Sequence, residues 1–451
     1  MKRSDKSYML TGSLWKGIIL FAIPVALTAL LQQLFHSVDM MVVGSYCGHN
    51  ELAAVGSNNA VINLLVNVFM GLSMGANVVI GHLTGEGNRE MAKKAMHTSL
   101  ALSVLSGIIV AGLGFSLARK LLELISSPPE VIDLATLYLR IYFLGIPFLM
   151  VYNFSAAILR SRGETTIPFL CLTTGGILNV FLNIFFVTVF KMGVAGVAVA
   201  TSISNGVACF LILKYLFNKK KEFHLEIKEV RVHKNIFRRI LYQGIPLSIH
   251  MALFPFSNMF LQSAINTLGA ITVAGNAASI SLESYAMQFS DGFSQAALNF
   301  VSQNKGAKNY KRCIRSALIS VFYSLIFMNA INLIIFIFKE KLLGFFTTDP
   351  QVIAMGIDRL SFMFIFYFLA SLQGIATNTI RGLGYPIFST ITSIVCVCGL
   401  RIVWMNTIFK MYPTYKMVLL TYPVTWLATF LILTVCIIFV FNKERKLKCQ
   451  E

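Results

Sequence analysis

Long apolar segments alternate with short polar ones along the whole chain. Twelve of the apolar segments are long enough to cross a bilayer as helices, which takes about 20 residues. Lipid offers the backbone no hydrogen-bond partners, and the segments lack the strict alternation of barrel strands, so the pattern predicts an all-helical polytopic membrane protein. The segments lie near residues 14–43, 51–81, 95–118, 131–157, 165–189, 193–217, 237–267, 270–303, 314–338, 351–380, 386–409 and 417–441.

Composition agrees with this class. Hydrophobic residues make up 56% of the 451 residues and charged residues only 13%, which excludes an ordinary water-soluble protein. The eight cysteines are scattered and follow neither metal-ligand nor disulfide spacing. The sequence contains no GxxxxGK[ST] phosphate loop and no HExxH zinc motif. We therefore expect neither an enzyme nor a resident cofactor or metal.

The basic residues are distributed unevenly between the loops. If the amino terminus is cytoplasmic, the inner segments include the basic clusters Lys219–Arg239, Lys305–Arg315 and Lys443–Lys448, while the outer loops carry few basic residues. The positive-inside rule then predicts a multi-pass protein of the cell membrane with both termini in the cytoplasm. The net charge of +19 is spread over separate loops, so we expect it to face anionic membrane lipid and not nucleic acid.

Short motifs recur in the second half of the chain at a constant offset of 221 residues. We therefore predict two six-helix lobes at residues 1–217 and 236–442, joined by a cytoplasmic loop at 218–235 and followed by a basic cytoplasmic tail at 443–451. Because six is even, the repeat is parallel, and two such lobes can enclose a central cavity that opens to alternate sides by rocking. A static scaffold fits the repeat equally well. The recurring pairs are Gly71 and Gly292, Gly85 and Gly306, Asn88 and Asn309, Pro129 and Pro350, Arg160 and Arg381, and Gly163 and Gly384.

An acid near the end of the first span is the leading functional candidate. A charged carboxylate at membrane depth costs about 2.5 to 3.5 kcal/mol, so Asp39 should be protonated, paired or exposed to a wet cavity. In the fifth span, Asn179 and Asn183 are four residues apart and share a helix face, and the sixth span carries Thr201. We predict that Asp39 binds the coupling ion and that Pro24 is the hinge of the first helix, because proline removes a backbone hydrogen bond. The alternative is that Asp39 reaches the interface and is merely solvated.

Other polar residues within the spans are candidates for substrate contacts. They are His36 in the first span, Asn258 in the seventh, and Glu283 and Gln288 in the eighth. A desolvated carboxylate attracts an organic cation, and neighbouring aromatic rings add cation–π contacts of about 0.5 to 2 kcal/mol. The alternative for Glu283 is a structural ion pair with Arg401 in the eleventh span.

Several motifs together resemble one family, the multidrug and toxic compound extrusion (MATE) transporters. The motifs are IPVALTALLQQLFHSVDMMVVG in the first span, LAAVG opening the second, ILRSRGETTIP after the fourth and TIRGLGYP after the tenth. The resemblance implies an antiporter that expels cationic, amphipathic drugs or metabolites using an inward proton or sodium gradient. In the DinF-like branch the cation site of the first lobe matches Asp39, Pro24, Asn179 and Thr201 here. Asn183 stands where the branch often has Asp, and one carboxylate in place of two weakens sodium binding.

Two other functions are compatible with the same architecture. A flippase for lipid-linked saccharides would show a more cationic central cavity, whereas the intramembrane arginines Arg140, Arg359 and Arg401 are few. A passive channel would leak independently of any gradient. We expect small organic cations as substrates and a single chain as the working unit, with protons or sodium as the driving ion.

Overall fold

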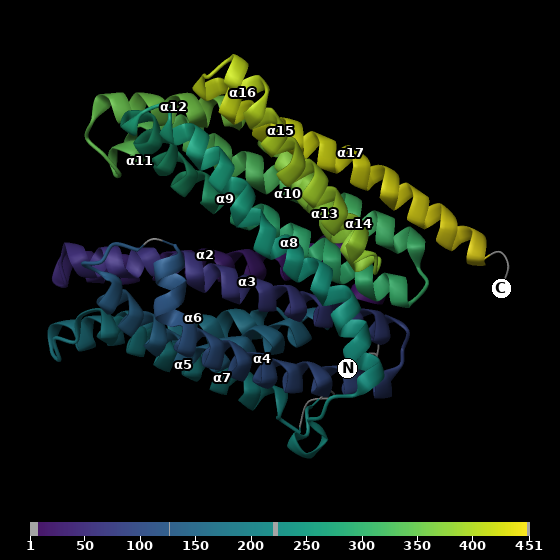
Figure 1. Cartoon of the computed structure of the whole chain (residues 1–451). Coiled ribbons are helices and arrows are strands. Elements are labelled where there is room, and N and C mark those ends of the chain that lie inside the picture. Colours follow the sequence, from purple (N-terminus) through teal and green to yellow (C-terminus); the bar gives the residue numbers. More distant parts are fainter. Residues whose placement is uncertain (1–7, 126, 220–223, 449–451) are drawn as a thin grey trace. The chain divides into compact units, whose positions relative to one another are not determined.

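The structure, a computed structural model, describes residues 8–125, 127–219 and 224–448, and within them every regular element is helical (Figure 1). After a short helix α1 (Tyr8–Thr11), the first half contains six long helices. A 3-10 turn, η1 (Ile227–Glu229), lies in the loop that leads to the second half. The six helices are α2 (Leu14–Tyr46), α3 (His49–Gly85), α4 (Arg89–Leu124), α5 (Ile132–Ser161), α6 (Thr166–Thr188) and α7 (Gly193–Leu216).

The second half contains the same succession of long elements, with two of them interrupted. Its first three are continuous: α8 (Lys234–Asn266), α9 (Ala270–Gly306) and α10 (Tyr310–Ile337). The short helix α11 (Lys339–Gly344) follows, and then the elements that form the last three spans. These are α12 (Pro350–Phe364) with α13 (Tyr367–Gly382); α14 (Pro386–Ser393), the π-helix η2 (Ile394–Gly399), α15 (Leu400–Asn406) and α16 (Ile408–Met411); and α17 (Tyr415–Lys448).

The predicted all-helical membrane class is confirmed. Among the described residues, ten helices are long and apolar enough to cross a membrane, and α12 with α13, bent by 56°, makes an eleventh. The remaining long element is α9, a 37-residue helix whose polar residues, including Glu283 and Asp291, lower its hydropathy. A helix of that length is about 55 Å long, which is more than a bilayer requires.

The internal repeat is visible in the local backbone. Asn88 and Asn309 both cap the following helix, because each side chain accepts a hydrogen bond from the backbone N–H three residues on. Gly163 and Gly384 both have a φ of 88°, a left-handed conformation that glycine adopts without strain. The motifs that recur at an offset of 221 residues therefore build the same turns in both halves.

By compactness the chain divides into two units. One, here the Glu283 unit, consists of Met1–Ala26 and Ile249–Glu451; the other, here the Asp39 unit, is Leu27–Ser248. The division falls inside α2, two residues after Pro24, and again inside α8. These units follow packing, whereas the lobes expected at 1–217 and 236–442 follow the sequence repeat and stay a prediction.

A recurring glycine lies where α8 and α2 each pack against another helix of the same unit. In the Asp39 unit, a Cβ added to Gly71 of α3 would lie 2.4 Å from the backbone N of Ser248 in α8. In the Glu283 unit, a Cβ on Gly292 of α9 would lie 2.7 Å from the carbonyl oxygen of Ala22 in α2. At either distance a Cβ would overlap the neighbouring backbone, so glycine is required at both positions. The first part of α8 thus packs closely on α3 of the Asp39 unit, and the first part of α2 packs closely on α9 of the Glu283 unit.

Candidate functional site

Asp39 is buried in the last third of α2, with 8% of its surface exposed. Its carboxylate Oδ1 accepts a hydrogen bond from Nδ2 of Asn183 in α6. Within the part of the chain that the structure describes, Asp39 forms no ion pair with a lysine, arginine or histidine. The alternative in which Asp39 is solvated at the interface is therefore wrong in this conformation, since the group is enclosed by protein.

The amides predicted to surround Asp39 lie beside it. Asn183 Nδ2 also contacts Oδ1 of Asn179 at 3.2 Å, and Asn179 Nδ2 donates to Oγ1 of Thr201 in α7 at 3.3 Å. The side-chain Oδ1 of Asn183 is buried and accepts no hydrogen bond from any described residue. The structure thus brings all four residues together, and their role in coupling stays a prediction.

Two tyrosines of α5 form part of the same environment. Tyr138 and Tyr142 are stacked, with ring centroids 6.1 Å apart and planes 14° apart. Both lie close enough to Asp39 to interact with its charge. Sequence reasoning missed them, although two tyrosines four residues apart on one face of a span are a readable signal.

The other two predicted residues of α2 are placed as follows. His36 is exposed, and its Nε2 lies 3.5 Å from Nδ2 of Asn59 in α3. Pro24 lies inside α2, and the helix continues on both sides of it. The predicted roles of His36 in substrate binding and of Pro24 as a hinge stay predictions.

The second buried acid has a full set of partners. Glu283 is 5% exposed and Arg359 2% exposed, and the two form a bidentate ion pair with N–O distances of 2.9 and 2.8 Å. Arg359 Nη1 also donates to Oδ1 of Asn276 at 2.7 Å, and the hydroxyl of Tyr415 donates to the same oxygen at 3.0 Å. Burial of both charges is offset by this pairing and these hydrogen bonds.

The predicted alternative, a structural ion pair between Glu283 and Arg401, is wrong in its partner, because Glu283 pairs with Arg359. Arg401 instead donates from Nη1 to Oγ of Ser257 at 3.2 Å and to Oδ1 of Asn258 at 2.9 Å. The guanidinium groups of Arg401 and Arg359 lie 5.1 and 5.3 Å from the ring centroid of Tyr422, within cation–π range. In this conformation, therefore, the side-chain oxygen of Asn258 is a hydrogen-bond acceptor for Arg401.

The network around Arg359 contains residues that sequence reasoning did not single out. Asn276 and Tyr415 were missed, although Asn276 and Glu283 are seven residues apart and so lie on one face of α9. Gln288, a predicted substrate contact, is half-buried on the same helix. The Glu283 unit thus holds two buried arginines and one buried acid in this network, whereas the Asp39 cluster holds one acid and neutral groups.

Long helices in a two-fold repeat, with a separate buried polar cluster in each compact unit, are typical of a polytopic membrane transporter. The chain belongs to the MATE family: the MatE family model matches residues 24–185 and 246–405, which include parts of both repeat halves. The predicted family is confirmed.

Known relatives support the assignment along most of the chain. A probable multidrug resistance protein, YoeA of Bacillus subtilis, is 27% identical over 398 residues, covering 86% of each chain. The probable multidrug resistance protein NorM of Thermotoga maritima is 27% identical over 394 residues, covering 86% of this chain and 84% of the relative. A solved multidrug resistance MATE family transporter in an outward-facing conformation aligns with a TM-score of 0.89 at 22% identity, covering 99% of this chain and 100% of the other. This likeness confirms the predicted two-lobe, twelve-helix fold.

Proposed function

We propose that the protein is a secondary active antiporter that exports cationic, amphipathic small molecules in exchange for protons. The relatives named as multidrug resistance proteins support drug export, and the cationic, amphipathic class is what the family resemblance implies. We also propose that it lies in the cell membrane with both termini cytoplasmic, as the basic loops predict. One chain suffices as the transport unit, because each polar cluster is formed within a single chain.

The contrast between the two buried acids carries this proposal. Glu283 is neutralised by Arg359, whereas Asp39 has only a neutral amide on its carboxylate among the described residues. A buried carboxylate without a counter-charge is costly in its ionised form. A proton or a metal cation removes that cost, so the occupancy of Asp39 determines how stable its buried position is. A conformational change of the Asp39 unit can therefore respond to the driving ion.

We favour the proton over sodium as the driving ion. A hard cation needs several oxygen ligands and enough negative charge to offset its dehydration. Asp39 supplies the one carboxylate, and Asn183 has one unused carbonyl oxygen. Protonation needs only the carboxylate itself, and burial favours the neutral form of the group. Sodium, held by Asp39 with the oxygens of Asn183 and Thr201, is the alternative.

Alternating access would follow from repacking of α2. Pro24 has no backbone N–H, so one hydrogen bond of the α2 helix is missing there, and the division between the compact units falls two residues after it. We propose that neutralising Asp39 lets the segment beyond Pro24 repack, which changes the side to which the transporter is open. His36, Asn258 and Gln288 are the proposed substrate contacts; Glu283 takes part only in a state in which Arg359 has released it.

The experiment is Asp39→Asn in sealed membrane vesicles, with the pH and sodium gradients varied independently. Asparagine keeps the size of the side chain and imitates the protonated form, so the variant should insert normally while gradient-driven drug uptake falls to background. Asp133→Asn is the matched control, because Asp133 is exposed and pairs with Arg119 on the surface.

The outcomes separate the competing functions. Uptake by Asp39→Asn that persists with unchanged pH dependence would show that the coupling ion binds elsewhere. Drug movement in the wild type that ignores both gradients would indicate a passive channel. Transport that requires a lipid-linked saccharide would indicate a flippase.

A further inference from the structure

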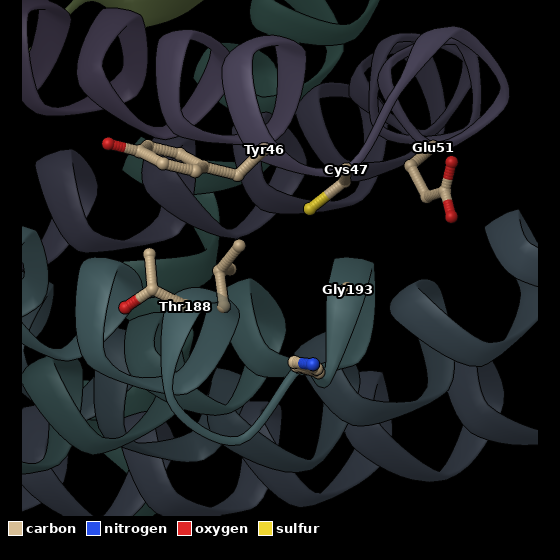
Figure 2. A pocket seen from close by; sticks show the side chains of 7 residues that line it. Tyr46, Cys47, Glu51, Thr188 and Gly193 are labelled. Atoms are coloured by element: carbon tan, nitrogen blue, oxygen red, sulfur yellow. The ribbon is translucent and has the colours of Figure 1, made fainter.

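A pocket lies at the end of the Asp39 unit where α2 meets α3 and α6 meets α7. It has a volume of about 440 Å³ and is open to the surface. Figure 2 shows Tyr46, Cys47 and Glu51 on one wall, with Thr188 and Gly193 on the facing wall. The positive-inside prediction puts these helix ends on the outer side of the membrane. We call this pocket the outer vestibule; its lining is completed by Val187 and Lys191.

The helices that line the outer vestibule are the ones that hold the coupling cluster. On α2, Asp39, Val43 and Tyr46 follow one another at intervals of four and three residues and share a face. On α6, Asn183 and Val187 are four residues apart and share a face. With a rise of about 1.5 Å per residue, the seven residues from Asp39 to Tyr46 span about 10 Å along the helix. The vestibule therefore lies about two helical turns beyond the carboxylate.

Along three helices, a buried valine comes between the residues of the cluster and the end of the helix at the outer vestibule. α7 repeats the order seen on the other two helices, with Gly193 at the vestibule, Val197 four residues on, and Thr201 of the cluster after another four. Val43, Val187 and Val197, here the valine plug, are all buried in the same apolar core cluster. Buried apolar side chains on an ion path stop ions until the path widens and is wetted.

Two charged residues line the vestibule, Glu51 and Lys191, and of the two it is Glu51 that acts on the Cys47 thiol. Glu51 lies half-buried in the first turn of α3 and pairs with no basic group among the described residues. Burial and the negative charge of Glu51 together raise the pKa of the neighbouring Cys47 thiol. Lys191 contributes the opposite charge from an exposed position on the facing wall.

We propose that the outer vestibule is the entry port for the driving cation, that Glu51 attracts the cation to it, and that the valine plug closes its path to Asp39 in the conformation described. This proposal rests on the proposed coupling role of Asp39. It assigns to Glu51 and the plug a function in transport that is separate from ion binding itself.

The native thiol of Cys47 allows a direct measurement of the potential in the vestibule. Methanethiosulfonate reagents carrying a trimethylammonium or a sulfonate group are applied to intact cells, with Cys47→Ser as the background. After correction for intrinsic reactivity, the cationic reagent should react with Cys47 about two- to fivefold faster than the anionic one, as expected for one nearby charge in a hydrated site. Glu51→Gln should abolish this preference, and Lys191→Gln should increase it. An unreactive Cys47, or a preference that Glu51→Gln leaves unchanged, would overturn the proposal.

The functional consequence is measured on the same labelled protein. Attaching the cationic label to Cys47 places bulk and positive charge in the port, so gradient-driven drug uptake should fall at least about tenfold. The Cys47→Ser protein, treated identically, should keep its uptake, because the thiol itself has no part in the proposal. Complete labelling with unchanged uptake would refute an entry route through this pocket.

Asp39→Asn, assayed in parallel, separates the two proposals. If that variant keeps gradient-driven uptake, the coupling role of Asp39 fails. If it loses uptake while labelled Cys47 has no effect, the coupling role stands and only the entry route fails.

Discussion

Glu283→Gln offers the sharpest test of the buried network in the Glu283 unit. The change removes one negative charge, and leaves the Arg359 guanidinium charged and buried, with one amide oxygen where two carboxylate oxygens stood. Both partners are almost inaccessible to solvent, so their interaction is not screened by water. Removing one partner of a buried ion pair costs about 3 to 5 kcal/mol, because the other charge is left uncompensated. That cost lowers the ratio of folded to unfolded protein by more than about a hundredfold.

The measurement is the apparent melting temperature of the purified protein in detergent, together with its abundance in the membrane. Glu283→Gln should lower both, and the double change Glu283→Gln with Arg359→Gln should recover much of the loss, because no unpaired charge remains. The interaction term of this cycle should be about 0.5 to 3 kcal/mol. Glu340→Gln, which removes an exposed acid of α11, should stay within about 0.5 kcal/mol of the wild type.

Melting of Glu283→Gln at the wild-type temperature would refute the reasoning, since the pair would then contribute nothing to the fold. If that variant also transported organic cations less well, its charge would serve the substrate, as the sequence predicts.

Two further predictions concern helix packing and the loop that contains η1. Gly71→Leu should destabilise the protein by about 1 to 3 kcal/mol or more, because its Cβ would collide with the backbone of Ser248. Gly112→Leu is the control and should be tolerated, because no atom lies within 4 Å of a Cβ at that position. The apparent melting temperatures of the two variants test the difference. The Lys93 ammonium, 2.8 Å from Glu226, holds the pKa of that carboxyl below its usual value of 4.5. Glu226 therefore stabilises docking of the loop above pH 4.5 and loses this effect as the pH falls through its lowered pKa. The protection of the η1 amides from hydrogen exchange, corrected for the intrinsic pH dependence of exchange, should fall there; protection that is unchanged by acid or by Lys93→Ala would contradict this.

The membrane class and the succession of spans could be predicted because hydropathy is a local property. An apolar segment of sufficient length must form a helix in lipid whatever surrounds it. The repeat could be found for the same reason, since a cap such as Asn88 or a left-handed glycine such as Gly163 acts within one turn of the chain. The same local information missed the bend of 56° between α12 and α13, where an apolar run continues without proline.

The grouping of Asp39 with Asn179, Asn183 and Thr201 came from the family resemblance and from helix spacing, and the contacts bear it out. Spacing within α6 aligns the two amides on one face, which is again a local property. The absence of a counter-charge on Asp39 among the described residues, in contrast, is not a local property of the sequence. It depends on which side chains of other helices approach it, and hydropathy carries no information on that.

The partner of Glu283 shows what only the tertiary structure decided. Arg359 and Arg401 both lie within apolar spans, so composition treats them alike. Which of them reaches α9 depends on how each helix is rotated about its own axis and on which helices are neighbours. The π-helix η2, directly before α15, changes the rotation of the segment that carries Arg401, and that arginine contacts Ser257 and Asn258 of α8. A pairing across 76 residues of sequence is set by the packing of whole helices, which no local pattern encodes.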